Sequence, residues 1–167
     1  MKIDGKTEES WRSTGFMKVD DITLPSEERM AEGPVAVIEC PEKIPCDPCQ
    51  DNCPVGAIKL NDINDTPEVD FDKCTGCSIC VESCPGLAIF TVDCSPGDGC
   101  DVSLPYEFTL PEIGEAVIGL NREGDEITEA RVVKVKTREE STRDTPVVTV
   151  RVSEKFVEEL RNIRRKE

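Results

Sequence analysis

Residues 74–85 read Cys-Thr-Gly-Cys-Ser-Ile-Cys-Val-Glu-Ser-Cys-Pro, with cysteines at positions 74, 77, 80 and 84. Three thiols at this spacing let one tight loop wrap an iron–sulfur cubane and bind three of its irons. The fourth thiol lies one helical step further along the chain, where it reaches a neighbouring cluster. Zinc is the alternative, but a zinc site takes four thiolates and has no use for a third in-line cysteine followed by Cys-Pro. The stretch therefore predicts an iron–sulfur site.

A second copy of this pattern begins 31 residues earlier. The two copies match at three cysteines and the proline that follows. Cys46, Cys49, Cys53 and Pro54 correspond, in that order, to Cys77, Cys80, Cys84 and Pro85. The offset predicts a leading cysteine at position 43, where the chain has Lys43, and the nearest substitute is Cys40. Five residues between Cys40 and Cys46 make the loop bulge, and Pro41 and Pro45 stiffen that bulge enough to present the thiolate.

We therefore expect two [4Fe–4S] clusters whose ligands are shared crosswise between the two copies. Cluster A takes Cys40, Cys46, Cys49 and Cys84. Cluster B takes Cys53, Cys74, Cys77 and Cys80. The alternatives to Cys40 are Cys94, Cys100 or no cysteine at all, and the last would leave a three-iron or solvent-ligated cluster. Otherwise Cys94 and Cys100 are expected to form a disulfide or to remain free thiols.

The two loops also predict an order of reduction potentials. The loop of cluster A contains Pro48, which has no N–H to donate to sulfur, beside the anionic Asp47. The loop of cluster B contains Gly76, which can turn its amide toward sulfur. Because amide donors raise a cluster's potential and nearby negative charge lowers it, we expect cluster A to have the lower potential.

The composition limits the chemistry further. There are ten cysteines and no histidine, which excludes His-containing zinc sites, Rieske centres and histidine acid–base catalysis. No phosphate-binding glycine motif and no nucleophile motif is present, so we expect no catalytic site and no FAD or NAD bound by this chain. The N-terminal MKIDGKTEES has no apolar run, and the longest apolar stretches are strand-sized. These features predict a cytoplasmic protein with no membrane span.

Charge is distributed unevenly along the chain, which has a formal net charge of -15. Residues 31–101 contain 14 Asp or Glu against 3 Lys or Arg, whereas residues 120–167 contain 11 and 12. An acidic cysteine-rich part repels phosphate backbones, so nucleic acid is not expected as a ligand. It favours a protein partner with a basic patch, although acidic residues also simply keep a domain soluble.

Residues 35–92 resemble a two-cluster bacterial ferredoxin on the two motifs given above. The first motif, Cys-Pro-Glu-Lys-Ile-Pro-Cys, with an acidic arm before it and a β-rich tail behind, is similar to the small ferredoxin-like subunits of FAD-dependent amino-acid and glycerol-phosphate dehydrogenases. That resemblance implies an electron-relay subunit of a hetero-oligomer that takes electrons from a flavoprotein subunit. The alternatives are a free-standing low-potential ferredoxin and, from another class, a structural or redox-sensing iron–sulfur module.

The expected fold is α+β, with a two-cluster bacterial ferredoxin-like domain followed by a small antiparallel β domain and a C-terminal helix. The expected parts are an extended N-terminal arm (1–33), the ferredoxin-like domain (34–94), a linker (95–111) and the β-rich domain with its helix (112–167). Within the arm, Ser26 is expected to cap a short helix that ends at Gly33.

Apolar patterning places the expected elements. Strands are expected at Val35–Ile38, Ile89–Val92, 116–120, around Val133 and Val135, and at Val148–Val152, with a hairpin of Ile58–Leu60 and Val69–Phe71. The last helix is expected because Phe156, Leu160 and Ile163 would share one face, with Ser153 as its cap.

Overall fold

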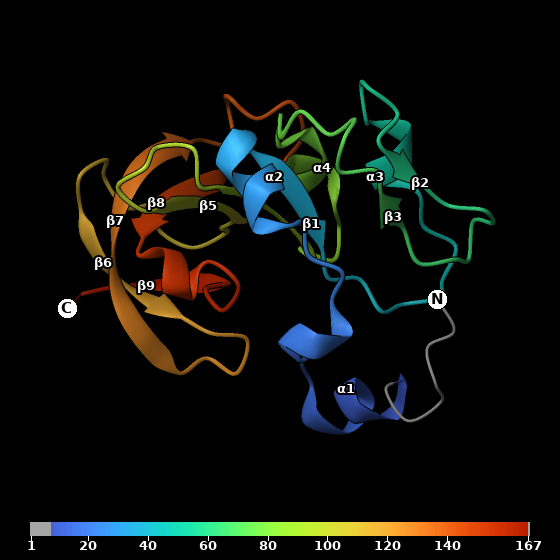
Figure 1. The fold of residues 1–167 in the computed structure, drawn as a ribbon, viewed down its shortest axis with the longest axis horizontal. Coiled ribbons are helices and arrows are strands. Elements are labelled where there is room, and N and C mark those ends of the chain that lie inside the picture. The colour runs from blue at the N-terminus through green and yellow to red at the C-terminus, as the bar shows by residue number, and fades with distance from the viewer. Residues whose placement is uncertain (1–7, 167) are drawn as a thin grey trace.

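In a computed structural model, which describes residues 8–166, the chain is organised around one seven-stranded antiparallel sheet (Figure 1). The strand order is β1-β4-β5-β8-β7-β6-β9, and a separate two-stranded sheet pairs β2 with β3. The strands are β1 (Val35–Ile38), β2 (Ile58–Lys59), β3 (Glu68–Val69), β4 (Ile89–Asp93), β5 (Cys100–Pro105), β6 (Ala116–Leu120), β7 (Glu126–Lys136), β8 (Val147–Val152) and β9 (Asn162–Arg165). The helical segments are α1 (Glu8–Thr14), η1 (Val19–Asp21), α2 (Glu27–Glu32), α3 (Pro48–Asp51), α4 (Ile79–Ser83) and η2 (Glu154–Phe156).

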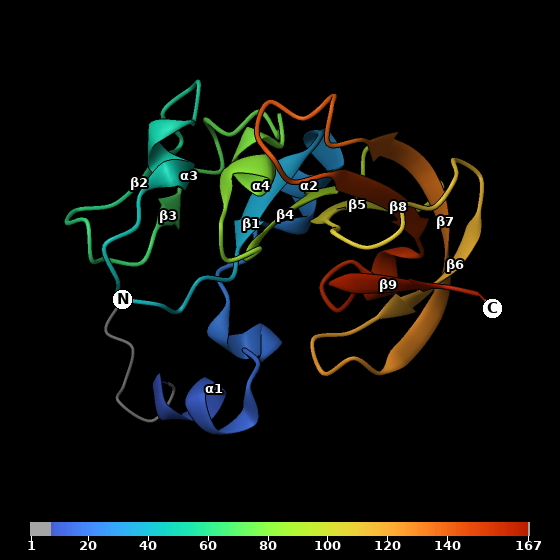
Figure 2. The same cartoon turned by 180° about the vertical axis from the view of Figure 1, so that it is seen from behind.

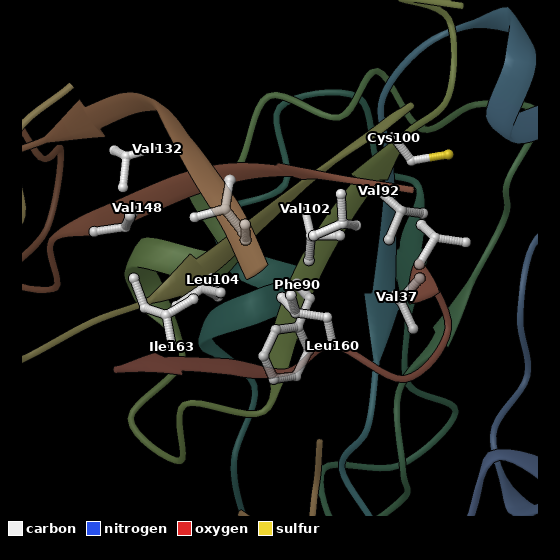
Figure 3. Packing of buried hydrophobic residues seen from close by; sticks show 14 of the residues in the cluster. Val37, Phe90, Val92, Cys100, Val102, Leu104, Val132, Val148, Leu160 and Ile163 are labelled. Atoms are coloured by element: carbon white, nitrogen blue, oxygen red, sulfur yellow. The ribbon is translucent and has the colours of Figure 1, made fainter. Parts of the chain in front are cut away.

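The large sheet curves around the main hydrophobic core. Alternate residues of β5 and β8 point inward, so Val102, Leu104, Val148 and Val150 are fully buried. Side chains from strands at both ends of the sheet meet them there, including Val37 from β1 and Ile163 from β9 (Figure 3). Branched side chains pack well on a pleated surface, and their burial is the main force that holds the curved sheet together.

Strands β1 and β4 separate this core from a second one. Their register pairs Ala36 with Thr91 and Val37 with Phe90, so neighbouring residues face opposite sides. One face supplies Val37 and Phe90 to the main core, while Ala36 and Ile89 belong to the second core, which also contains Cys49 and Cys80. The same two strands thus back the sheet core on one side and the cysteine-bearing helices on the other.

The expected strands are confirmed: β1 has the predicted bounds, and β4, β6 and β8 lie where strands were expected. The expected hairpin is confirmed as the shorter pair β2 and β3, and the strand around Val133 is the longer β7. The internal repeat is visible as well, because α3 and β2 correspond at the offset of 31 residues to α4 and β4. The predicted helix after Ser26 is confirmed as α2, where the Ser26 hydroxyl accepts a 3.2 Å hydrogen bond from the Arg29 amide.

The expected C-terminal helix is wrong. After the short turn η2, residues Asn162–Arg165 form strand β9, which pairs with β6 so that Ile163 lies opposite Gly119. Ser153 makes no capping hydrogen bond. The apolar spacing misled because Leu160 and Ile163 do enter one core, but they reach it from a turn and a strand that complete the free edge of β6.

Two further segments differ from the expected organisation. Residues 100–105 form β5 in the middle of the sheet, although they were expected within a linker. Helix α1 lies in the expected extended arm, of which residues 1–7 fall outside the described part of the chain. Where one domain ends and the next begins stays a prediction. Among residues 8–166, the structure has no helix of sufficient length and apolarity to cross a membrane.

The cysteine-bearing segments gather at one end of the molecule. Helices α3 and α4 and the β2–β3 hairpin lie there, whereas β6, β7 and β9 lie at the opposite end (Figures 1 and 2). The loop of residues 137–146, between β7 and β8, reaches back over α4 (Figure 2). The sheet therefore supports the cysteine-bearing end from one side and sends a loop across it.

Candidate metal centre

Four of the cysteines line one cavity. Cys40, Cys46 and Cys49 come from the first copy of the motif and Cys84 from the second, with Pro48 and Pro85 beside them. Burial and the nearby Cys84 thiol raise the pKa of Cys49 to about 11. Burial also raises the pKa of Cys40, and the nearby Cys84 and Cys46 thiols raise it further. The structure thus brings together the four thiols predicted for cluster A, with Cys40 among them.

The other four predicted thiols form a second group around Cys80. Burial raises the pKa of Cys80 to about 12, and the neighbouring Cys74, Cys77 and Cys53 thiols add to the shift. Cys53 comes from the first copy and the other three from the second. Thiols that resist ionisation when crowded together become thiolates when iron supplies positive charge, so the donor chemistry of both groups fits a metal cluster.

Backbone amides point at several of these sulfur atoms. The Ala36 amide donates to Cys74 Sγ and the Ala57 amide to Cys53 Sγ, both at 3.3 Å. The Ala88 amide donates to Cys84 Sγ at 3.4 Å. Burial raises the pKa of Cys53, but the surrounding amides outweigh it and lower the pKa overall. Such donors stabilise thiolate, which is the form that binds iron.

The loop before Cys77 is held by close contact with the start of β1. Gly76 has a φ of 62°, and a Cβ there would lie 2.4 Å from Pro34, so glycine is required. The Arg29 guanidinium donates to the carbonyl of Cys74 at 2.7 Å and to that of Phe71 at 2.8 Å. Helix α2 and strand β1 together therefore position the Cys74 loop.

Glu82 is a buried carboxylate on α4, between Cys80 and Cys84, with 2% of its surface exposed. It accepts hydrogen bonds from the Thr142 amide at 2.6 Å, the Thr142 hydroxyl at 2.7 Å and the Ser141 hydroxyl at 3.1 Å, and it pairs with Lys136. Burial raises the pKa of Glu82, but these donors outweigh it and lower the pKa overall. Lys136 and the 137–146 loop thus fix helix α4, which contains Cys80 and ends just before Cys84.

The same loop also reaches α3, since Arg143 hydrogen-bonds Asn52, next to Cys53. A second buried ion group lies beside Cys40: Glu39 accepts from Arg122 at 2.7 and 2.9 Å and also pairs with Arg161. Sequence reasoning missed these supports. A carboxylate between two cysteines of one short helix was a visible signal for Glu82, but nothing local identified its partners.

Cys94 and Cys100 form a disulfide with each other. This is one of the outcomes expected for the pair, and it leaves neither thiol available to complete a cluster. Among residues 8–166, no three Cys, Asp or Glu side chains are arranged to hold a single metal ion. A cubane spreads its cysteine sulfurs more widely than one ion does.

Comparison with protein families agrees with the second motif. Residues 67–90 match the 4Fe-4S binding domain. This 4Fe-4S binding domain spans β3, α4 and the start of β4, and it contains Cys74, Cys77, Cys80 and Cys84. The match is a single copy, so the number of clusters stays a prediction. No solved structure matches the chain.

Three curated relatives are each similar to less than a third of the chain. The chain is 45% identical over 51 residues to ferredoxin-type protein NapF of Haemophilus influenzae, which is 28% of each chain. It is 44% identical over 46 residues to a subunit of the ion-translocating oxidoreductase complex of Methanosarcina acetivorans, covering 28% of this chain and 17% of the relative. It is 43% identical over 49 residues to pyruvate synthase subunit PorD of Methanocaldococcus jannaschii, covering 29% and 56%. The chain thus spans little more than half of these relatives at most.

Proposed function

We propose that this chain is an electron-transfer protein that holds two [4Fe–4S] clusters. Cys40, Cys46, Cys49 and Cys84 ligate cluster A, and Cys53, Cys74, Cys77 and Cys80 ligate cluster B. The observation that carries the proposal is the grouping of the thiols. Each group of four takes three thiols from one copy of the motif and the fourth from the other, which is the crosswise sharing typical of two-cluster ferredoxins.

When bound, a cubane with four thiolate ligands accepts and releases one electron with little change in its bonds. The protein contributes a rigid and partly buried setting. Cys49 and Cys80 are buried, Ala36 and Ala57 donate amides to ligand sulfurs, and Glu82 fixes the helix between the two groups. A setting that does not move when the charge changes keeps the reorganisation energy of electron transfer low.

The broader role that we propose is an electron-relay subunit of a larger oxidoreductase. Two of the relatives are named as subunits, of an ion-translocating oxidoreductase complex and of pyruvate synthase. A flavoprotein partner stays a prediction that rests on the resemblance of the whole chain. Copurification of the native protein with a flavin-containing subunit supports this role, whereas a lone monomer favours a free-standing ferredoxin.

The test of the cofactor content is chemical analysis of anaerobically prepared protein. We expect eight irons and eight acid-labile sulfides per chain, and an EPR spectrum of the reduced protein with two interacting clusters. A colourless protein that holds zinc, or one with four irons per chain, refutes the two-cluster proposal. Failure of fast reduction by any electron donor, with both clusters present, favours the structural or redox-sensing alternative.

A further inference from the structure

We propose that the surface over the cluster A thiols docks a redox protein whose own surface is basic; this inference rests on the electron-transfer role proposed above. Two exposed side chains mark the surface, since Ile44 is 50% exposed and Ile63 is 48% exposed. Their loops, 41–47 and 61–67, lie side by side, because the Cys46 amide donates a 3.2 Å hydrogen bond to the Ile63 carbonyl.

Both loops also line the cavity that contains the cluster A thiols. Glu42 and Cys46 from the first loop and Asp65 and Pro67 from the second form part of its wall. A partner that contacts these two loops therefore lies against the wall of the cavity that contains the thiols. Electron tunnelling falls steeply with distance, so a docking surface is effective only where a cluster lies close beneath it.

The two exposed isoleucines lie outside the hydrophobic cores of the described part of the chain. Ile44 lies among the five residues between Cys40 and Cys46, where the second copy of the motif has two residues between its first two cysteines. The longer loop thus adds an exposed apolar side chain beside cluster A, and exposed apolar groups next to a functional site commonly mark an interface.

The charge around these isoleucines defines the partner. The two loops carry Glu42, Asp47, Asp62 and Asp65 against Lys43. Exposed apolar side chains on two neighbouring acidic loops fit a partner that surrounds its redox group with Lys and Arg, because opposite charges steer the encounter and set its orientation. We name this surface, formed by Ile44, Ile63 and the four carboxylates, the acidic port.

The experiment measures electron transfer from the reduced chain to oxidised mitochondrial cytochrome c, a small basic haem protein, by anaerobic stopped flow. We expect the double variant Ile44→Ser/Ile63→Ser to lower the second-order rate constant about tenfold, with iron content and reduction potentials unchanged. The matched control is Phe108→Ser/Ile113→Ser, which alters side chains that are 71% and 67% exposed, outside both loops. We expect this control to remain within about twofold of the parent protein.

Two charge-reversal variants test whether the carboxylates of the acidic port contribute to docking. Asp62→Lys is expected to slow the reaction and flatten its dependence on ionic strength, whereas Asp125→Lys, in the turn between β6 and β7, is expected to do neither. Equal second-order rate constants for the isoleucine variant and the control refute docking at the acidic port. So does a larger loss from Val55→Ser, which alters the exposed residue two positions after Cys53. These outcomes are distinct from failure of the proposed function, in which the parent protein itself lacks reducible clusters.

Discussion

Replacement of Glu82 by glutamine tests whether the β7–β8 loop stabilises the cluster-binding helix. The amide keeps one oxygen for the Thr142 donors but presents an N–H₂ group to Lys136, so a charge-assisted hydrogen bond is lost. Such a bond contributes roughly 1.5–3 kcal/mol. Because the Lys136 side chain is 28% exposed and can turn toward water, we expect a loss of about 2 kcal/mol.

Loss of iron makes unfolding irreversible, so the appropriate assay is the decay rate of cluster absorbance in guanidinium under anaerobic conditions. A loss of about 2 kcal/mol corresponds to decay up to about 30-fold faster, if the contact is already broken in the rate-limiting opening. Lys136→Met and the double variant complete a cycle that isolates the coupling between the two residues.

Glu129→Gln is the matched control, because Glu129 also pairs with a lysine, Lys166, but both side chains are largely exposed. We expect its decay rate to equal that of the parent protein. If Glu82→Gln decays no faster than Glu129→Gln, the loop does not stabilise α4 and the reasoning is wrong.

Four further predictions concern the cysteine loops. Gly76→Ala places a Cβ against Pro34, so it should reduce the iron content from eight to four per chain. Its control is Gly56→Ala, at nearly the same φ but with open space around the Cβ. This control should lower the free energy of unfolding by only about 1–2 kcal/mol and retain all the iron. Cys94→Ser/Cys100→Ser should lower the free energy of unfolding by about 2 kcal/mol, because the disulfide no longer constrains the unfolded loop. Chemical analysis of this variant should still find eight irons. Cys40→Ser should give the EPR signal of a three-iron cluster on air oxidation and leave cluster B unchanged. In an EPR-monitored redox titration of site-assigned variants, cluster A should reduce at the lower potential, and the reverse order would contradict this.

The structure adds to the reasons for that order of potentials. Two thiols proposed for cluster B, Cys74 and Cys53, accept amide hydrogen bonds from Ala36 and Ala57 at 3.3 Å, whereas Cys84, proposed for cluster A, accepts a longer one from Ala88 at 3.4 Å. Around cluster A, Glu42 lies close enough to Cys40, and Asp47 to Cys46, to raise the pKa of these thiols, although burial is the larger cause for both. Negative charge that disfavours thiolate also disfavours an added electron.

Local chemistry explains which parts of the molecule the sequence could predict. The cysteine spacing predicted both sets of four cysteines, because each set depends on two short loops and the helices that follow them. Short apolar runs predicted β1 and β4, which are buried on both faces, whereas alternation predicted β6 and β8. The end of the chain could not be predicted in the same way, since Leu160 and Ile163 satisfy a helical spacing equally well. What decided their conformation was the unpaired edge of β6, more than 40 residues away.

The residues that hold the cysteine-bearing helices in place could not be predicted, for a related reason. The hydrogen bonds of Glu82 come from residues 54 to 60 positions further along the chain. A single sequence shows that a carboxylate lies between two cysteines, but not which loop reaches it. Buried polar groups are bonded in native structures, so the sequence indicates that Glu82 needs donors without indicating where they come from.

The ion group of Glu39 bears on how the protein is made. All eight cysteines proposed as cluster ligands have been synthesised by residue 84, yet the two arginines that pair with Glu39, next to Cys40, come later: Arg122 and Arg161 follow Glu39 by 83 and 122 positions. On a ribosome, the Cys74 loop finds Arg29 and the start of β1 already present, whereas Glu39, beside Cys40, lacks its second arginine until residue 161 has been made. A chain terminated before residue 122 would therefore keep the contacts of the Cys74 loop with Arg29 but leave the buried Glu39 carboxylate without either of its arginines.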